Sequence, residues 1–205
     1  MSKVVVVESV TLDGVMQAPG RPDEDTRDGF EHGGWAVPYN DEVMGKTMGE
    51  GMASTRAMLF GRRTYDDFAG FWPQQEDNPI TAHLNRVQKY VVSGSLHEPL
   101  PWQNSTLVGG DPFEEVARLR RAPGGDLVVL GSGVLVRSLA RHGLVDEYVL
   151  LIHPLVLGTG TRLFGDHEVG ALRLVDSVAT TTGVVIATYR PEPGPERPQA
   201  GGATR

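Results

Sequence analysis

The sequence contains no cysteine, which excludes disulfides, a thiolate nucleophile and cysteine-ligated metal centres. Its six histidines show neither His-x-x-x-His nor 2-His-1-carboxylate spacing, so no metal site is expected. Lys and Arg number 19 against 26 Asp and Glu, and this net charge of -7 disfavours a nucleic-acid partner, since binding phosphates requires surplus basic residues. The longest early apolar run, Val4 to Val7, is too short to span a membrane, and no signal-peptide pattern follows it. We therefore expect a soluble, cytoplasmic protein.

Short runs rich in β-branched residues predict strands, and several lack the polar alternation of a sheet with one solvated face. They span residues 3–10, 57–60, 89–92, 105–108, 127–130, 147–152, 172–180 and 184–189. Helices are predicted between the earlier strands, at residues 40–54, 64–68, 113–121 and 134–142. This alternation favours an α/β fold with a mostly parallel sheet.

The last two predicted strands are separated only by Thr181, Thr182 and Gly183, so they should close the sheet as an antiparallel hairpin. The predicted sheet is therefore mixed. No repeat or linker divides residues 1–190, which we interpret as one domain. Residues 191–205 are rich in proline and glycine and offer almost no apolar residues, which predicts a disordered tail.

Residues 11–38 form the one long segment without periodicity. Loops of this length in a small domain are usually functional or disordered. The segment could fold over a ligand as a lid, or it could be a solvent-exposed insertion. The sequence leaves both interpretations open.

An apolar strand at residues 127–130 leads into Gly131-Ser132-Gly133 and then into a helix. Glycines at such a turn let backbone N–H groups approach a pyrophosphate, and the start of the helix adds partial positive charge. The dinucleotide-binding fingerprint requires a small residue where Val136 stands, which disfavours an ordinary Rossmann domain. A plain tight turn is the alternative.

A second strand leads into Gly61-Arg62-Arg63-Thr64, where two arginines at a helix start oppose the helix dipole unless an anion binds there. A third strand ends at Ser93-Gly94-Ser95. The carboxyl ends of parallel strands meet at one edge of a sheet, where open α/β folds bind ligands. The three junctions therefore predict one phosphate-binding site.

The order of these segments resembles the dihydrofolate reductase-like superfamily, and most closely the C-terminal reductase domain of the bifunctional riboflavin-biosynthesis deaminase-reductase. The resemblance covers residues 3–189 and implies a three-layer α/β fold that binds NADPH. The segments that carry it are residues 9–14, 60–65, 92–96, 131–133, 143–147 and 154–160.

The resemblance also implies roles for individual residues. The cofactor-binding set would hold the 2′-phosphate, pyrophosphate, adenosine and nicotinamide, and it consists of Gly14, Gly61, Arg62, Arg63, Thr64, Ser93, Ser95, Gly131, Ser132, Gly133, Val134 and Leu135. Asp13, Trp35 and Asp41 are the candidate catalytic residues on the proton side. For Asp13 a turn role is the alternative, because Asp-Gly is a favoured turn pair.

The implied function is NADPH-dependent reduction of a small heterocyclic or sugar-bearing substrate, like that of 5-amino-6-(5-phosphoribosylamino)uracil reductase. The deaminase half of the bifunctional enzymes and its zinc motif are absent from this sequence. Dihydrofolate reduction is an alternative, although Asp41, Glu42 and Glu50 match imperfectly the carboxylate that pairs with a pterin. Another alternative is a nucleotide-binding protein without turnover. The resemblance also implies a homodimer.

Overall fold

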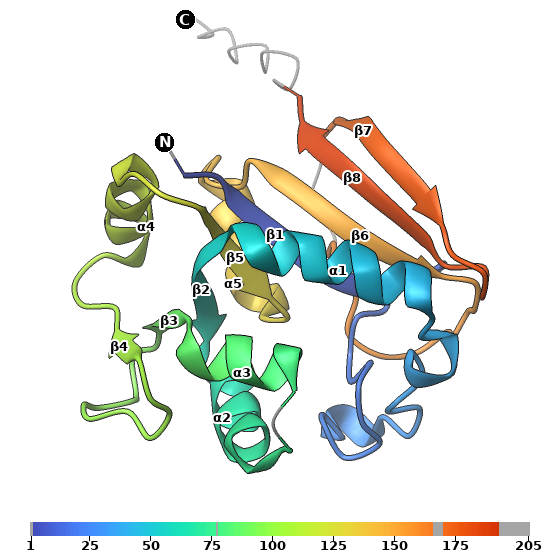
Figure 1. Ribbon diagram of the computed structural model, residues 1–205, viewed down its shortest axis with the longest axis horizontal. Coiled ribbons are helices and arrows are strands. Elements are labelled where there is room, and N and C mark those ends of the chain that lie inside the picture. The colour runs from blue at the N-terminus through green and yellow to red at the C-terminus, as the bar shows by residue number, and fades with distance from the viewer. Residues whose placement is uncertain (1, 77, 166–169, 193–205) are drawn as a thin grey trace, which may run out of the picture.

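The structure is a computed structural model that describes residues 2–76, 78–165 and 170–192 (Figure 1). Within these residues eight strands form one sheet in the order β4-β3-β2-β5-β1-β6-β8-β7. The strands are β1 (Val4–Thr11), β2 (Thr55–Gly61), β3 (Gln88–Val92), β4 (Ser105–Leu107), β5 (Asp126–Leu130), β6 (Glu147–His153), β7 (Leu172–Ala179) and β8 (Val185–Pro191).

All neighbouring strands from β4 to β6 are parallel, whereas β8 pairs antiparallel with both β6 and β7. The predicted α/β fold, with its mixed, mostly parallel sheet and C-terminal antiparallel hairpin, is therefore confirmed. β1 lies between β5 and β6, and its Val4 and Val6 are fully buried. A near-continuous apolar run is typical of a strand covered on both faces.

Helices cover both faces of the sheet. α1 and the pair α2 and α3 pack against one face, with α1 crossing in front of the sheet in Figure 1, while α4 and α5 pack against the other. This gives the three layers that were expected. The helices are α1 (Glu42–Ser54), α2 (Arg62–Phe71), α3 (Pro79–Arg86), α4 (Pro112–Arg121) and α5 (Gly133–Arg141).

Two helices differ from the prediction. The sequence interpretation missed α3, which is too short to show clear periodicity, although Asn78 and Pro79 are typical of a helix start. The side chain of Asn78 accepts hydrogen bonds from the N–H groups of Ile80 and Thr81. The second helix was predicted at residues 64–68, but α2 begins two residues earlier and continues to Phe71.

The long segment after β1 has an apolar interior of its own, although many of its residues are exposed. It contains two short 3-10 helices, Arg27–Gly29 and Val37–Tyr39, and Val15 forms an isolated bridge with Arg162. Its interior is a small apolar cluster of Val15, Ala18, Phe30, Trp35 and Ala36. Apolar packing of this kind fixes the path of the segment over the sheet.

The C-terminal strand extends to the edge of the predicted tail. Pro191 belongs to β8, and the N–H of Glu192 still donates to the carbonyl of Ala171. Residues 193–205, which make up the rest of the predicted tail, lie outside the described residues. Among the helices that are described, none combines the length and the apolar character that a membrane span requires.

Candidate functional site

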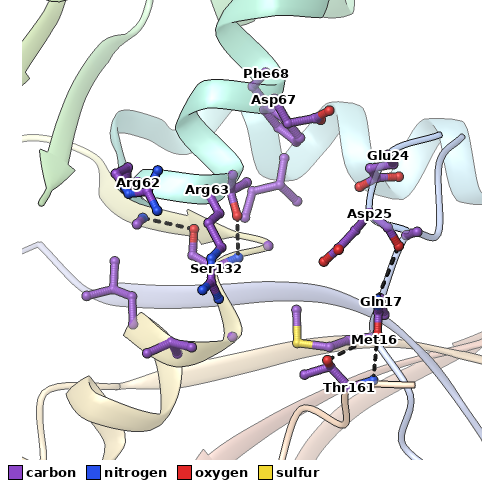
Figure 2. Close-up of a pocket in the computed structure, with 18 of the residues that line it drawn as sticks. Met16, Gln17, Glu24, Asp25, Arg62, Arg63, Asp67, Phe68, Ser132 and Thr161 are labelled. Carbon is purple, nitrogen blue, oxygen red and sulfur yellow. Dashed lines mark hydrogen bonds between the residues drawn. The ribbon is translucent and has the colours of Figure 1, made fainter. Parts of the chain in front are cut away.

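A cleft of about 1280 Å³ lies at the edge of the sheet where β2 and β5 end, beside the middle of β1. The first turns of α2 and α5 form one side, and residues 16–27 of the long segment form the other. Figure 2 shows Ser132 beside the first turn of α2, with Glu24 and Asp25 on the loop opposite. Ligands of open α/β folds bind at this kind of edge.

Two hydrogen bonds join the strand-to-helix junctions inside the cleft. The Ser132 hydroxyl accepts from the N–H of Gly61, and the Thr64 hydroxyl accepts from the N–H of Ser132, each at 3.0 Å. Gly131 has φ +63°, and a Cβ there would lie 2.9 Å from the Thr64 methyl carbon. The residue is therefore glycine for two reasons, its left-handed backbone and the close approach of Thr64.

The helices at the cleft begin differently from the other α-helices. Asp41, Asn78 and Asp111 cap α1, α3 and α4 through side-chain hydrogen bonds. Gly61 and Ser132, at the starts of α2 and α5, provide no such bond. The positive ends of two helix dipoles therefore face the cleft without a side-chain cap, an arrangement that favours an anionic ligand.

Arg62 and Arg63 both lie on the exposed first turn of α2, at the rim of the cleft. The Arg62 guanidinium pairs with Asp66 at 3.2 Å, four residues along the helix. The pKa of Asp25, on the opposite side of the cleft, is lowered mainly by the hydrogen bond from Arg27. The positive charge of Arg63 lowers it further. Both side chains thus lie beside the helix start where an anion would bind, with Arg62 shared with Asp66.

The structure places most of the predicted cofactor-binding residues together. Gly14, Ser93 and Ser95 lie outside the cleft lining, and the Ser93 hydroxyl accepts from the N–H groups of Ser95 and Leu96 within its own turn. The predicted residues that do line the cleft are Gly61, Arg62, Arg63, Thr64, Gly131, Ser132, Gly133, Val134 and Leu135.

None of the three predicted catalytic residues is among those that line the cleft. Asp13 accepts from the Thr11 hydroxyl at 2.6 Å and from the N–H of Gly158 at 2.9 Å. These bonds, with the Thr11 hydroxyl first, lower its pKa to about 2. The catalytic roles of Asp13, Trp35 and Asp41 stay predictions.

Trp35 and Asp41 also hold the fold together. The buried indole of Trp35 donates to the carbonyl of Gln17 at 2.8 Å. Asp41 caps α1 and also accepts from the backbone N–H and the hydroxyl of Thr181, both at 2.6 Å, which joins α1 to the C-terminal hairpin.

The sequence interpretation gave no site role to the acidic residues of the cleft, among which Glu8 and Glu24 are the most buried. Glu8, in β1, is only 3% exposed, and its Oε1 has no hydrogen-bond partner. Burial, and then the charge of Glu24, raise its pKa well above the usual value. Glu24 accepts from the N–H groups of Gly20 and Arg21, and burial raises its pKa too. A single glutamate inside an apolar strand was the signal that could have found Glu8.

The loop that carries Glu24 is fastened at both ends. Arg21 pairs with Asp67 of α2, and its guanidinium lies 4.1 Å from the centre of the Phe71 ring. At the other end the Gln17 amide accepts from the N–H of Thr161 at 2.9 Å and donates to the carbonyl of Asp25. The loop therefore spans the cleft from the turn after β6 to α2.

Comparison with known proteins places the chain in a family. The RibD C-terminal domain matches residues 2–186. YyaP, an uncharacterized protein of Bacillus subtilis (strain 168), is 31% identical over 193 residues, which cover 91% of this chain and 94% of YyaP.

Solved structures share the fold. A putative riboflavin biosynthesis protein from Shewanella sp. PV-4 is 21% identical with a TM-score of 0.66, covering 93% of this chain and 99% of that one. Dihydrofolate reductase from Enterococcus faecalis, complexed with NADP(H), is 13% identical with a TM-score of 0.60, covering 93% and 97%. These likenesses confirm the dihydrofolate reductase-like fold.

Proposed function

This chain belongs to the RibD C-terminal domain family, and on that premise we propose that it is an NADPH-dependent reductase of a small heterocyclic or sugar-bearing substrate. The observation that carries the proposal is the pair of helix starts without side-chain caps, joined by Ser132 and Thr64 beside a large cleft. Catalysis by such an enzyme depends mainly on positioning donor and acceptor.

The residues present fit a dinucleotide. Gly131 leaves room for Thr64, which lets the starts of α2 and α5 lie close together, and two adjacent helix starts suit a pyrophosphate. Arg62 and Arg63 would hold the 2′-phosphate, and Gly133 would lie alongside the pyrophosphate. When bound, the reduced nicotinamide would supply a hydride, which is a proton with two electrons, to the substrate.

The remaining part of the cleft supports a flat, partly polar substrate. Phe68, Phe71 and Trp72 of α2 and its following turn offer aromatic surface, and Glu24 and Asp25 offer carboxylates on the facing loop. Aromatic rings and a few convergent polar groups are typical of sites for small heterocycles.

The direct experiment measures NADPH consumption by the purified protein against a panel of pterins, pyrimidines and carbonyl compounds. We expect oxidation of NADPH with a pyrimidine or a related heterocycle. Turnover with dihydrofolate alone would instead support a dihydrofolate reductase, whose fold this chain shares. Binding of NADPH without oxidation across the whole panel would support a nucleotide-binding protein and contradict the proposal.

The cofactor preference can be tested separately, by replacing Arg62 and Arg63 together with alanine. We expect the double variant to lose NADPH affinity while NADH binding is nearly unchanged, because only NADPH carries the 2′-phosphate. A charge-assisted contact is worth roughly 1.5–3 kcal/mol, or about 10-fold to 150-fold in affinity, and exposure favours the lower end. Titrations followed by nicotinamide fluorescence at two salt concentrations give both affinities.

A matched control replaces Arg86 and Arg121, both exposed and outside the cleft lining, with alanine. This variant has the same net charge as the test variant and should bind NADPH like the wild type. Equal wild-type affinities for NADPH and NADH would falsify the assignment of the two arginines.

We also propose that the protein acts in the cytoplasm and, as the resemblance implies, that it is a homodimer. Support for the dimer comes from the exposed apolar side chains of the edge strand β7, where Leu174 is 50% and Val175 is 39% exposed. Apolar patches of this kind often mark contacts between subunits.

A further inference from the structure

Glu8 is a carboxylic acid in an apolar setting. Side chains alternate along a strand, so Glu8 shares its face of β1 with Val4, Val6 and Val10, which belong to the core beneath α4 and α5. It is nevertheless part of the cleft lining. A buried acid in contact with a ligand cleft is a group from which a proton can be delivered.

The register of the sheet places Glu8 beside the predicted cofactor turn. Val7 pairs with Leu130, the last residue of β5, so the next residue of the parallel strand β1 is level with Gly131. The side chain of Met16 also reaches this turn, since a Cβ on Gly133 would lie 2.5 Å from the Met16 sulfur. Glu8 and the turn therefore face one region of the cleft.

In the described part of the chain, no partner of Glu8 compensates a negative charge. Among the described residues it has no ion-pair partner, and its Oε1 is buried without a hydrogen bond. The charge that acts on it is that of Glu24, which has the same sign. An isolated buried carboxylate is costly, so such a group becomes neutral by keeping its proton.

On the basis of the reductase function proposed above, we propose that Glu8 is a catalytic acid, whose protonated carboxyl group donates the proton that the substrate takes up when it is reduced. A substrate C=N or C=O bond that accepts a hydride, which is a proton with two electrons, at carbon still needs a second proton at nitrogen or oxygen. The O–H bond of Glu8 breaks as the new N–H or O–H bond forms. The resulting carboxylate regains a proton from water that enters through the cleft.

Glu24 is the charged group that acts on the pKa of Glu8, and three arginines of the cleft have other partners. Arg21 and Arg27 are paired with carboxylates of the cleft, and the Arg137 guanidinium donates to the carbonyls of Arg162 and Leu163. These cations are therefore occupied elsewhere. The remaining charged side chains that line the cleft are Asp23, Glu24, Asp25, Arg62, Arg63, Asp66 and Asp67.

The protonation of Glu8 can be measured without any ligand, by infrared difference spectroscopy between the wild type and Glu8→Gln at pH 7. Glutamine resembles the protonated acid in size and charge, so the variant should fold. We expect the difference spectrum to contain the carbonyl stretch of a protonated carboxylic acid. Glu31→Gln, at an exposed position of the same long segment outside the cleft, should show carboxylate bands instead. Carboxylate bands alone for Glu8 would overturn the proposal.

The stability of the two proteins provides a second measurement. The folded protein holds a proton on Glu8 at pH values where the unfolded chain, with an ordinary glutamate pKa near 4.5, has released it. Wild-type stability should therefore fall relative to Glu8→Gln as the pH rises above about 4.5, until Glu8 itself ionises. The melting temperature of the wild type minus that of Glu8→Gln should therefore decrease over this range, whereas the same difference for Glu31→Gln should stay constant. A constant difference for Glu8→Gln contradicts the buried proton.

Turnover measurements test the proton transfer from Glu8 to the substrate. With a panel compound that the wild type reduces, Glu8→Gln should lower kcat about 100-fold or more and leave the Kd for NADPH unchanged, because general acids contribute that much. Unchanged turnover with a protonated Glu8 would overturn this inference alone. A wild type that consumes no NADPH with any panel compound would overturn the proposed function, and the catalytic role of Glu8 with it.

Discussion

At the scale of single residues, Asp13 illustrates how a loop is held by one carboxylate. Its oxygens accept hydrogen bonds from the Thr11 hydroxyl and from the N–H groups of Leu157 and Gly158, so it connects the turn after β1 to the turn after β6. Asparagine offers one oxygen in place of two. This geometry favours the turn role over the catalytic one.

We therefore expect Asp13→Asn to lower the melting temperature by about 2–4 °C, which corresponds to roughly 1 kcal/mol for one hydrogen bond in a domain of this size. Turnover should be unchanged. The pKa of Asp13 is lowered to about 2, so its stabilising effect is present above the ordinary value of 3.8 and is lost as the pH falls through 2. The gap between variant and wild type should close over that range. A large loss of kcat with normal stability would restore Asp13 as a catalytic residue.

Lys89 makes a comparable contribution inside the sheet. It is fully buried, and its Nζ donates to the carbonyls of Asn85, Val87 and Gln103 and lies 4.3 Å from the centre of the Trp102 ring. One cation thus satisfies three backbone acceptors around the end of α3 and the loop before β4.

Lys89→Met should destabilise the protein by about 2–3 kcal/mol, because the carbonyls lose their donor in a buried place. Lys46→Met, on the exposed side of α1, is the matched control and should change stability by less than about 0.5 kcal/mol. Urea denaturation at pH 7 measures both values. Similar values for the two variants would show that water replaces the ammonium group.

The sequence shows Glu8 as the one acidic residue of an apolar run, but for a physical reason it does not show what Glu8 faces. Its place in the run from Val4 to Val10 identifies a strand, but its burial depends on packing from β5, α5 and the long loop, which are distant in the chain. The positions of Asp13 and Trp35 relative to the cleft depend on long-range contacts in the same way. The glycines and arginines at the strand ends were easier to predict as site residues, because their chemistry and their position between a strand and a helix both indicate anion binding.

At the scale of elements, the contact between the two junctions predicts the effect of a single methyl group. Gly131 and Gly143 have nearly the same φ, +63° and +64°, but a Cβ at Gly131 would meet Thr64 at 2.9 Å, whereas at Gly143 nothing lies within 4 Å. Alanine at either position suffers the same left-handed strain of roughly 1–2 kcal/mol. The difference between the variants isolates the contact with Thr64.

Gly131→Ala should therefore be less stable than Gly143→Ala and should bind NADPH more weakly, because α2 must move away from the turn that ends β5. Thermal unfolding and NADPH titration of the two variants provide the comparison. Equal stability and equal affinity would mean that Thr64 moves aside at no cost, and that the close approach has no function.

Elements with strong local signals were predicted well. Every strand was expected near its observed position because β-branched runs and short turns are local features. α3 was missed, since its eight residues give little periodicity and its N-cap is the main signal. The order β2-β5-β1-β6 brings residues 61–64 and 131–135 together. The alternation of strands and helices predicted parallel crossovers, but this local pattern does not specify which strands are neighbours.

At the scale of the whole molecule, the edge strand β7 bears on the oligomeric state. Replacing Leu174, which is 50% exposed, with lysine should convert the proposed homodimer to a monomer, because the new charge would be buried at an apolar contact. Light scattering coupled to size-exclusion chromatography gives the mass. Ile80→Lys, at a 46% exposed position on α3, should leave the mass unchanged. A wild-type mass of about one chain at micromolar concentration would contradict the dimer.

The two helix starts without side-chain caps have a consequence for the protein in the cell. A missing cap costs about 1 kcal/mol, so the ligand-free molecule lacks stability that an anion in the cleft would restore. A ligand at 100 times its Kd adds about 2.7 kcal/mol to folding stability. Degradation usually acts on the small unfolded fraction, so the half-life of the proposed reductase would lengthen when reduced cofactor is plentiful and shorten when it is scarce. The amount of the protein in the cell would then follow the concentration of the reduced cofactor, without any dedicated regulator.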